Sequence, residues 1–139
     1  MFLYMKNYND FNLEEIINKL LDSFKSLEVK EQVLDKEWFD KNLESNIDST
    51  GFCFYASEVI YRLFNGKERW TIKRISKEDF DEGPHYFLYD KLNNKILDIT
   101  SDQYTKLDIK IPYEKGKGRG LQNISKKAKI LANSIGYNL

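Results

Sequence analysis

Apolar residues near the start of the chain recur at three- and four-residue steps, the spacing of an amphipathic helix. These positions are Leu13, Ile16, Ile17, Leu20, Leu21 and Phe24. They predict a helix over residues 11–25, which Asp10 is expected to cap, with acidic side chains in the first turn where the helix dipole favours them. A weaker pattern of the same kind predicts a second helix over residues 30–44.

The densest apolar segment runs from Phe52 to Phe64 and predicts a buried central helix that ends at Asn65-Gly66. The preceding stretch, residues 46–51, is rich in residues that hydrogen-bond their own backbone or accept positive φ. It is therefore expected to be a loop that leads directly into Cys53.

Three later segments have the composition of β-strands, and they cover residues 70–75, 85–89 and 95–99. Residues 90–94 between the last two form a plausible hairpin turn, because Asn tolerates the left-handed conformation that such turns need. We therefore expect these two strands to pair in antiparallel fashion.

Glycines and a proline over residues 112–120 predict an irregular loop, after which Ser125 is expected to cap a final helix. The order of helices, strands and a last helix is typical of an α+β domain. A length of 139 residues fits one domain, residues 1–139, with a single core.

The charge balance narrows the range of partners. Lys plus Arg equal Asp plus Glu at 22 each, which argues against nucleic acid or an anionic membrane as the main partner. No stretch approaches the length of a membrane-spanning segment, and the N-terminus lacks the apolar region of a signal peptide. A cytoplasmic location is therefore expected.

The chain contains one cysteine and one histidine. A single cysteine cannot form an internal disulfide, and this pair cannot supply the three or four ligands of a conventional zinc site. No metal and no cofactor are expected. Two interpretations of Cys53 remain, a buried structural thiol or a nucleophile.

Cys53 lies at the first turn of the predicted central helix, where backbone N–H groups and the helix dipole stabilise a thiolate. A thiol with a free pKa of about 8.5 needs a base near neutral pH, and His85 is the only histidine available. Asp98, on the next strand, is expected to come near His85 across the hairpin and orient its ring. Asp102 is a rival for that role, and each residue also has a purely structural interpretation.

Gly51 and Gln103 are candidates for oxyanion stabilisation or substrate positioning. For Gln103, the alternative is a loop side chain bonded to backbone. The glycines of residues 116–120 form no P-loop and are interpreted as a surface loop. Several aromatic side chains are candidates for a cleft beside Cys53, although most are more simply core. They are Trp38, Phe39, Phe52, Phe54, Tyr55 and Trp70.

The order of Cys53 at a helix start, His85 opening a strand and Asp98 on the next strand resembles the transglutaminase-like branch of the papain-like superfamily. More closely, the segments GFCFYASE, GPHYFLYD and LDITSDQY resemble the YunG-like family of bacterial and phage proteins. PYEKGKGRG and the basic helix start at Ser125 are similar to its phage members. The resemblance covers about residues 45–130.

This resemblance implies a papain-like or transglutaminase-like fold, with N-terminal helices and the Cys-bearing helix packed on a small antiparallel sheet. It also implies a triad of Cys53, His85 and Asp98. Phe52 stands where related sequences often have a polar residue, so no side-chain role is carried over to it.

These patterns together predict a cysteine-dependent hydrolase or acyltransferase that attacks a peptide, protein or small amide or ester substrate through a thioester at Cys53. Peptidase, deamidase and transglutaminase outcomes share that first half of the reaction. The alternative is a noncatalytic binding protein of papain-like fold, of bacterial or phage origin.

Overall fold

The computed structural model describes residues 11–139, which form an α+β architecture as the sequence predicts. The described elements comprise six α-helices, four strands and two short 3-10 helices. In chain order they are α1 (Phe11–Ser23), α2 (Leu27–Val33), α3 (Lys36–Ser45), α4 (Cys53–Leu63), η1 (Gly66–Glu68), β1 (Trp70–Ile75), β2 (His85–Asp90), β3 (Lys95–Leu97), α5 (Asp102–Thr105), η2 (Tyr113–Lys115), β4 (Lys117–Arg119) and α6 (Lys126–Ser134).

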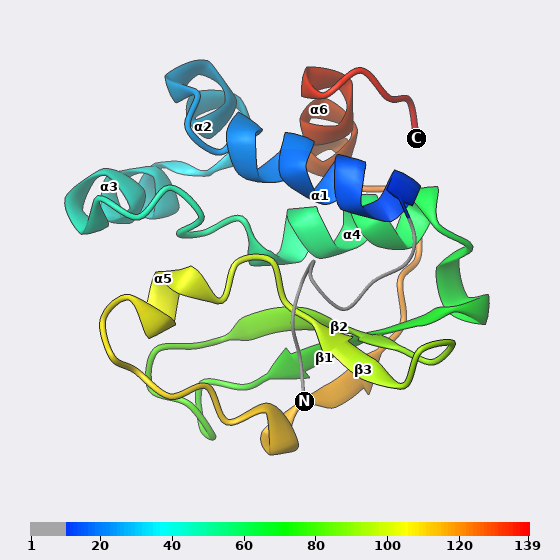
Figure 1. Cartoon of the computed structure of the whole chain (residues 1–139). Coiled ribbons are helices and arrows are strands. Elements are labelled where there is room, and N and C mark those ends of the chain that lie inside the picture. Colours follow the sequence, from blue (N-terminus) through cyan, green and yellow to red (C-terminus); the bar gives the residue numbers. More distant parts are fainter. Residues whose placement is uncertain (1–10) are drawn as a thin grey trace.

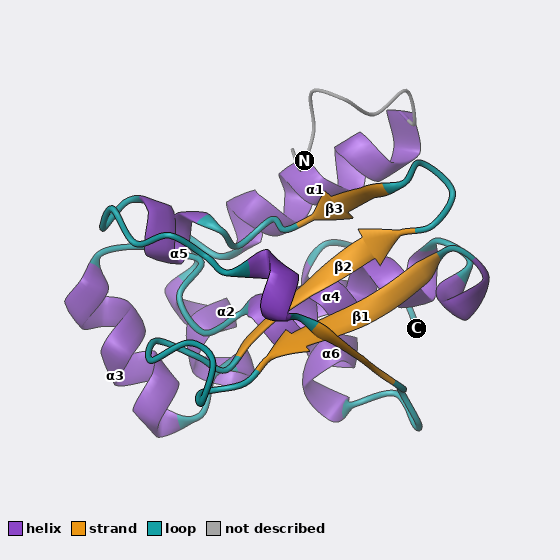
Figure 2. Ribbon diagram, turned by 90° about the horizontal axis from the view of Figure 1, so that it is seen from below, coloured by secondary structure: helices purple, strands orange, loops and turns teal. Residues whose placement is uncertain are grey.

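The four strands form one antiparallel sheet in the order β3-β2-β1-β4. Helices α1, α4 and α6 lie on one side of it, with α4 nearest the strands (Figure 1). Helices α3 and α5 lie beside the end of the sheet where β2 begins (Figure 2). That end of the sheet therefore faces loops and short helices, the setting in which functional sites commonly form.

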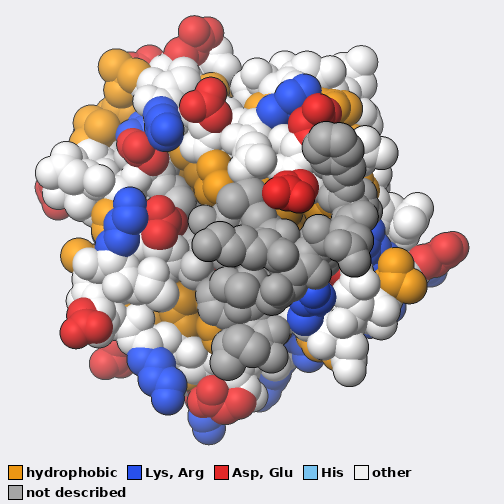
Figure 3. Space-filling model, viewed as in Figure 1, with side chains coloured by type: hydrophobic (Ala, Val, Ile, Leu, Met, Phe, Trp, Pro, Cys, Tyr) orange, Lys and Arg blue, Asp and Glu red, His pale blue; other side chains and the backbone are white. Residues whose placement is uncertain are grey.

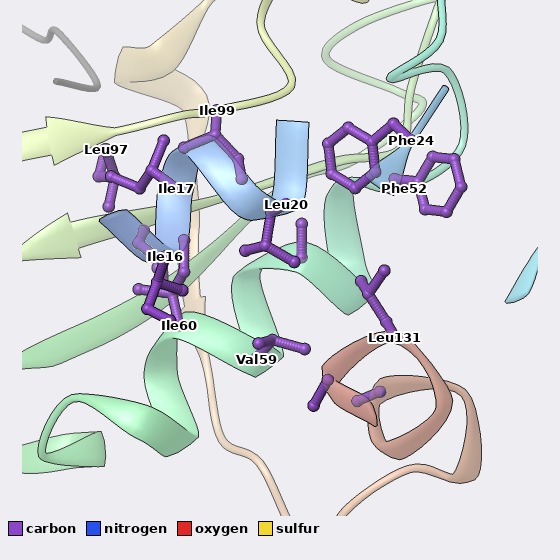
Figure 4. Close-up of a cluster of buried hydrophobic side chains, with 14 of the residues drawn as sticks. Ile16, Ile17, Leu20, Phe24, Phe52, Val59, Ile60, Leu97, Ile99 and Leu131 are labelled. Carbon is purple, nitrogen blue, oxygen red and sulfur yellow. The ribbon is translucent and has the colours of Figure 1, made fainter. Parts of the chain in front are cut away.

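The main apolar core lies between the helical layer and the sheet, and Figure 4 shows part of it. Phe24 and Phe52 stack within it with ring centroids 4.4 Å apart. Each fully buried Leu, Ile or Phe side chain contributes about 1.5–3 kcal/mol. This packing fixes α4, and with it the position of Cys53, against the sheet.

A smaller apolar cluster forms around Phe87, Ile75 and Tyr104. Successive side chains of a strand point to opposite faces, so Leu88 joins the main core while Phe87 joins the smaller cluster. The charged surface is mixed, because acidic and basic side chains are interspersed over the described part of the face in Figure 3. None of the described helices has the length and apolar character needed to cross a membrane.

The prediction of a single helix over residues 30–44 is wrong, because this segment is divided between two helices, α2 and α3. Leu34 is extended, with φ −84° and ψ 137°, and ends α2. Asp35 is also extended, and its side chain accepts a hydrogen bond from the Trp38 N–H as the N-cap of α3. An aspartate that caps a new helix competes with continuation of the old one.

The predicted hairpin between β2 and β3 is present, and its register pairs Asp90 with Lys95. Asn94 has φ 58°, the left-handed conformation expected of it. β3 ends at Leu97, shorter than the predicted strand over residues 95–99. Residues 117–119, expected to be loop, form edge strand β4, which pairs with β1 through its backbone.

Helix α1 ends at Ser23, close to the predicted end, and the predicted cap Asp10 lies outside the described residues. Ser125 is the N-cap of α6, as predicted, and accepts from the Ala128 N–H. Its hydroxyl also donates to the buried carboxylate of Glu58 on α4 over 2.8 Å, and its N–H donates to the same carboxylate over 3.1 Å. This cap therefore fastens α6 to the helix that carries Cys53.

We expect Ser125→Ala to lower the free energy of unfolding by about 2–3 kcal/mol, because it removes both a helix cap and a hydrogen bond to a buried carboxylate. Ser26 is the matched control, since it caps α2 in the same way but has no carboxylate partner among residues 11–139. Ser26→Ala should cost about 1 kcal/mol. Urea denaturation measures both values, and equal losses would contradict the anchoring role of Ser125.

Candidate active site

Cys53 is the first residue of α4 and is 9% exposed. The loop before it is held by Asn42, whose side-chain amide donates to the carbonyls of Asp48 and Thr50 over 2.9 and 2.8 Å. A helix leaves the N–H groups of its first turn without intrahelical partners. Cys53 therefore lies beside backbone donors, on a segment whose position is fixed from both sides.

Position 51 requires a glycine, because of its backbone conformation and because of close packing around it. Its φ is 89°, and a Cβ there would lie 3.1 Å from Leu34 Cδ2 and 3.2 Å from Trp38 Cβ. Its N–H donates to Gln103 Oε1 over 3.4 Å. Gly51 thus positions the loop and Gln103, and that N–H is already engaged within the protein.

His85 opens β2, and its Nε2 lies 2.7 Å from Asp98 Oδ2. Asp98 follows the end of β3 by one residue, and because Leu88 pairs with Leu97, the two side chains meet on a diagonal of the hairpin. Both are buried, with exposures of 0% and 2%. The predicted proximity of these two residues is present in the structure.

The Cys53 thiol also lies near the His85 ring and acts on its pKa. Burial lowers the pKa of His85, but the Asp98 charge and hydrogen bond, together with Cys53, raise it overall to about 10. Within the described part of the chain, His85 Nδ1 accepts or donates no hydrogen bond, so the thiol lies near the ring without being hydrogen-bonded to it. Such contacts are often long before substrate binds.

Two further side chains support Asp98, and the sequence did not indicate either. Tyr113, in η2, donates its hydroxyl to the same Oδ2 over 2.8 Å, and Thr100 donates to Oδ1 over 3.4 Å. Burial and the neighbouring Asp98 raise the pKa of Tyr113, so the phenol stays a neutral donor. Three donors thus converge on one buried carboxylate.

Asp102, the alternative partner of His85, is engaged elsewhere. Its carboxylate accepts a hydrogen bond from the Ser49 hydroxyl and lies 3.7 Å from Lys106 Nζ. It joins α5 to the loop before Cys53, and the imidazole is paired with Asp98 instead. In this geometry Asp98 is the residue positioned to orient the ring.

Gln103, in α5, is hydrogen-bonded to backbone, as the simpler of its two interpretations predicts. Its Oε1 accepts from the Gly51 backbone and its Nε2 donates to Thr100 Oγ1 over 3.1 Å. A primary amide carries two N–H donors, so one bond to Thr100 leaves a second donor. Gln103 also lines the cavity that contains Cys53.

This cavity has a volume of about 410 Å³, within the range of pockets for small molecules. Three of the expected cleft aromatics line it, namely Trp38, Phe54 and Tyr55. Phe52 and Trp70 lie in the main core instead, which leaves Phe52 no role in the site. The remaining lining residues are Leu34, Asp35, Gly51, Cys53, Pro84, Tyr86, Gln103, Tyr104 and Arg119.

The arrangement joins a thiol, an imidazole and a buried carboxylate beside a cavity large enough for an acyl group. Among residues 11–139, no cluster of three or more His, Cys, Asp or Glu side chains could hold a metal ion. The chain gave no significant match to a protein-family model, a curated protein or a solved structure.

We expect His85 to stay protonated at neutral pH and to lose its proton near pH 10. Asp98→Asn removes the charge that stabilises the imidazolium while burial remains, so the pKa should fall below the ordinary value. Because His85 is the chain's only histidine, its ¹⁵N NMR signals titrate without overlap. A wild-type midpoint between pH 6 and 7 would refute this assignment.

Tyr113→Phe should move the pKa of His85 in the opposite direction, upward, because the phenol draws charge away from the carboxylate oxygen that the ring contacts. The same change should cost about 1.5–3 kcal/mol of stability, the range for a hydrogen bond to a charged group. NMR titration and urea unfolding measure the two effects. A loss of stability with no pKa change would mean that Tyr113 only packs against Phe87.

Proposed function

We propose that this protein is a cysteine-dependent hydrolase or acyltransferase that forms a thioester at Cys53. The observation that carries the proposal is that the chain's only cysteine lines a cavity and lies near its only histidine, whose imidazole is hydrogen-bonded to the buried carboxylate of Asp98. These residues come from a helix start, a strand start and the turn after another strand.

In the first half of the reaction, the Cys53 thiolate attacks an amide or ester carbonyl, and a carbon–sulfur bond forms as the carbonyl electrons move to oxygen. The tetrahedral species then collapses and expels the amine or alcohol, which takes a proton from the His85 imidazolium. A pKa of about 10 keeps His85 protonated in the resting state and ready for this step.

In the second half, water or an amine attacks the thioester, and the neutral His85 accepts its proton. The thiolate leaves and the imidazolium is restored. Asp98 orients the ring and stabilises its charge through both steps. Hydrolysis and acyl transfer differ only in the acceptor, so the same three residues serve either outcome.

Donors for the developing oxyanion are supplied by the start of α4 and by the Gln103 amide. The N–H groups of the first helical turn point toward the space beside Cys53. Gln103 is held by Gly51 and Thr100, which gives its remaining amide hydrogen a fixed direction. Rigid donors of this kind need no reorganisation as charge develops.

A papain-like or transglutaminase-like fold is part of the proposal, as is the relationship to YunG-like proteins. Its support is the order of Cys-bearing helix, His-bearing strand and Asp-bearing hairpin, together with the packing of α4 on an antiparallel sheet. The alternative, a noncatalytic binding protein that uses the same cavity, is favoured by the low exposure of Cys53.

Alkylation of Cys53 by iodoacetamide at pH 6 distinguishes the two functions, since the chain has no other thiol. A paired thiolate should react about 10- to 100-fold faster than a free thiol, which is almost wholly protonated at that pH. Asp98→Asn should slow the reaction, whereas the matched change Asp102→Asn should leave it within about twofold.

Acyl transfer itself is tested with p-nitrophenyl acetate and intact-protein mass measurement. The wild type should gain one acetyl group at Cys53, and His85→Asn should gain it much more slowly. A wild-type thiol that reacts like free cysteine with both reagents would reject the enzyme and favour the binding protein.

A further inference from the structure

Two arginine side chains approach the ring of Tyr86 at the sheet side of the Cys53 cavity, and one of them, Arg119, lines that cavity. The Arg119 guanidinium, on β4, lies 5.0 Å from the Phe54 ring centroid and 5.7 Å from that of Tyr86. On the neighbouring strand β1, Arg74 donates to the Tyr86 hydroxyl over 3.1 Å. Phe54, Tyr86 and Arg119 all line the cavity. Both cations are thus oriented by the ring of Tyr86.

Neither guanidinium forms an ion pair with a carboxylate in the described part of the chain. The acidic group of the cavity, Asp35, lies on the helical side, where it caps α3. By contrast, Arg62 forms an ion pair with Glu58, and Arg69 forms one with Asp90. The cavity therefore has separated charges, with positive charge along the sheet.

We propose that Arg119, supported by Arg74 and Tyr86, is an anion-binding subsite that selects substrates carrying a carboxylate or phosphate group close to the reacting carbonyl. Cys53, Phe54 and Arg119 line the same cavity, so the cation that lies over Phe54 shares this space with the nucleophile. The proposal deepens the function proposed above and rests on it.

The chemistry of arginine supports an anionic group over a neutral one. Guanidinium presents several N–H donors in a planar fork that matches carboxylate and phosphate oxygens. Stacking on two rings reduces the freedom of the side chain, so less is lost when an anion binds. Asp35 repels an anion from the opposite side, which orients the substrate in the cavity.

Iodoacetate and iodoacetamide form a matched pair of probes, because they differ only in a carboxylate and a neutral amide. In both reactions the Cys53 sulfur bonds to the methylene carbon and iodide leaves with the bonding electrons. The ratio of the two rate constants, iodoacetate over iodoacetamide, reports the anion preference independently of general thiol reactivity.

We expect the wild-type ratio to exceed that of a free thiol, and Arg119→Gln to lower it about tenfold, the effect of losing one charge-assisted contact. Arg74→Gln should lower it less. Lys73→Gln is the matched control, because it removes one positive charge from β1 on the strand position next to Arg74 but outside the cavity, and it should leave the ratio unchanged.

The outcomes separate the two proposals. A thiol activated toward iodoacetamide, with a ratio that Arg119→Gln does not change, would overturn the anion subsite and keep the enzyme. If Arg119→Gln and Lys73→Gln lowered the rate-constant ratio equally, the subsite would also be overturned. The ratio would then depend on the net charge of the protein and not on a particular arginine.

A binding measurement tests the subsite even if Cys53 is inert. Wild type and Arg119→Gln are titrated with acetate and, separately, with inorganic phosphate at constant ionic strength, and arginine side-chain NMR signals are followed. A saturable shift of the Arg119 signal supports the subsite, and the tighter anion identifies carboxylate or phosphate as the group recognised. No saturation with either anion would overturn it.

Discussion

The hydrogen bond between His85 and Asp98 is the interaction on which the rest of the site depends. A charged imidazole at 0% exposure is costly unless an opposite charge and hydrogen bonds compensate for lost water. Asp98 supplies the charge, and it is in turn satisfied by Tyr113 and Thr100. Removing one member of such a group leaves the others buried without compensation, so the pair constrains its whole surroundings.

That constraint explains why the surrounding elements have their observed bounds. β3 ends at Leu97, and the chain must turn there for Asp98 to reach across the diagonal to His85. Thr100 and Gln103 follow within one short turn and extend the hydrogen bonds to Gly51, two residues before Cys53. A single connected set of side chains therefore links the carboxylate behind the imidazole to the loop that delivers the nucleophile.

The sequence predicts the parts of this arrangement that depend on local pattern. Helical periodicity predicted α4, and β-strand composition predicted the hairpin of β2 and β3. The residues Cys53, His85 and Asp98 follow from where these elements begin and end. The break at Asp35 was missed because an aspartate inside an apolar pattern is tolerated by a helix as well as preferred at a cap. Tyr113 was missed because its contact with Asp98 is set by the path of an irregular segment, which has no periodicity.

β4 was also missed, and its composition explains why. Gly118 and its charged neighbours have low β-propensity, and the strand forms because β1 offers an unpaired edge. Gly116, just before it, fits where a Cβ would lie 2.7 Å from Phe87 Cζ, and the Tyr113 ring packs edge-on against the same phenylalanine at 5.0 Å.

The segment from Tyr113 to Arg119 therefore contributes to the site at both of its ends. One end holds the carboxylate that supports His85, and the other places a cation in the cavity. Between them, Gly116 lets the chain pass close to Phe87, whose ring lies 6.2 Å from that of His85. An anion bound by Arg119 would contact the same short segment whose Tyr113 hydroxyl donates to Asp98. Under the two proposals, recognition of the substrate and support of the imidazolium would come from one segment of the chain, which offers a physical reason for a charged strand at the edge of this sheet.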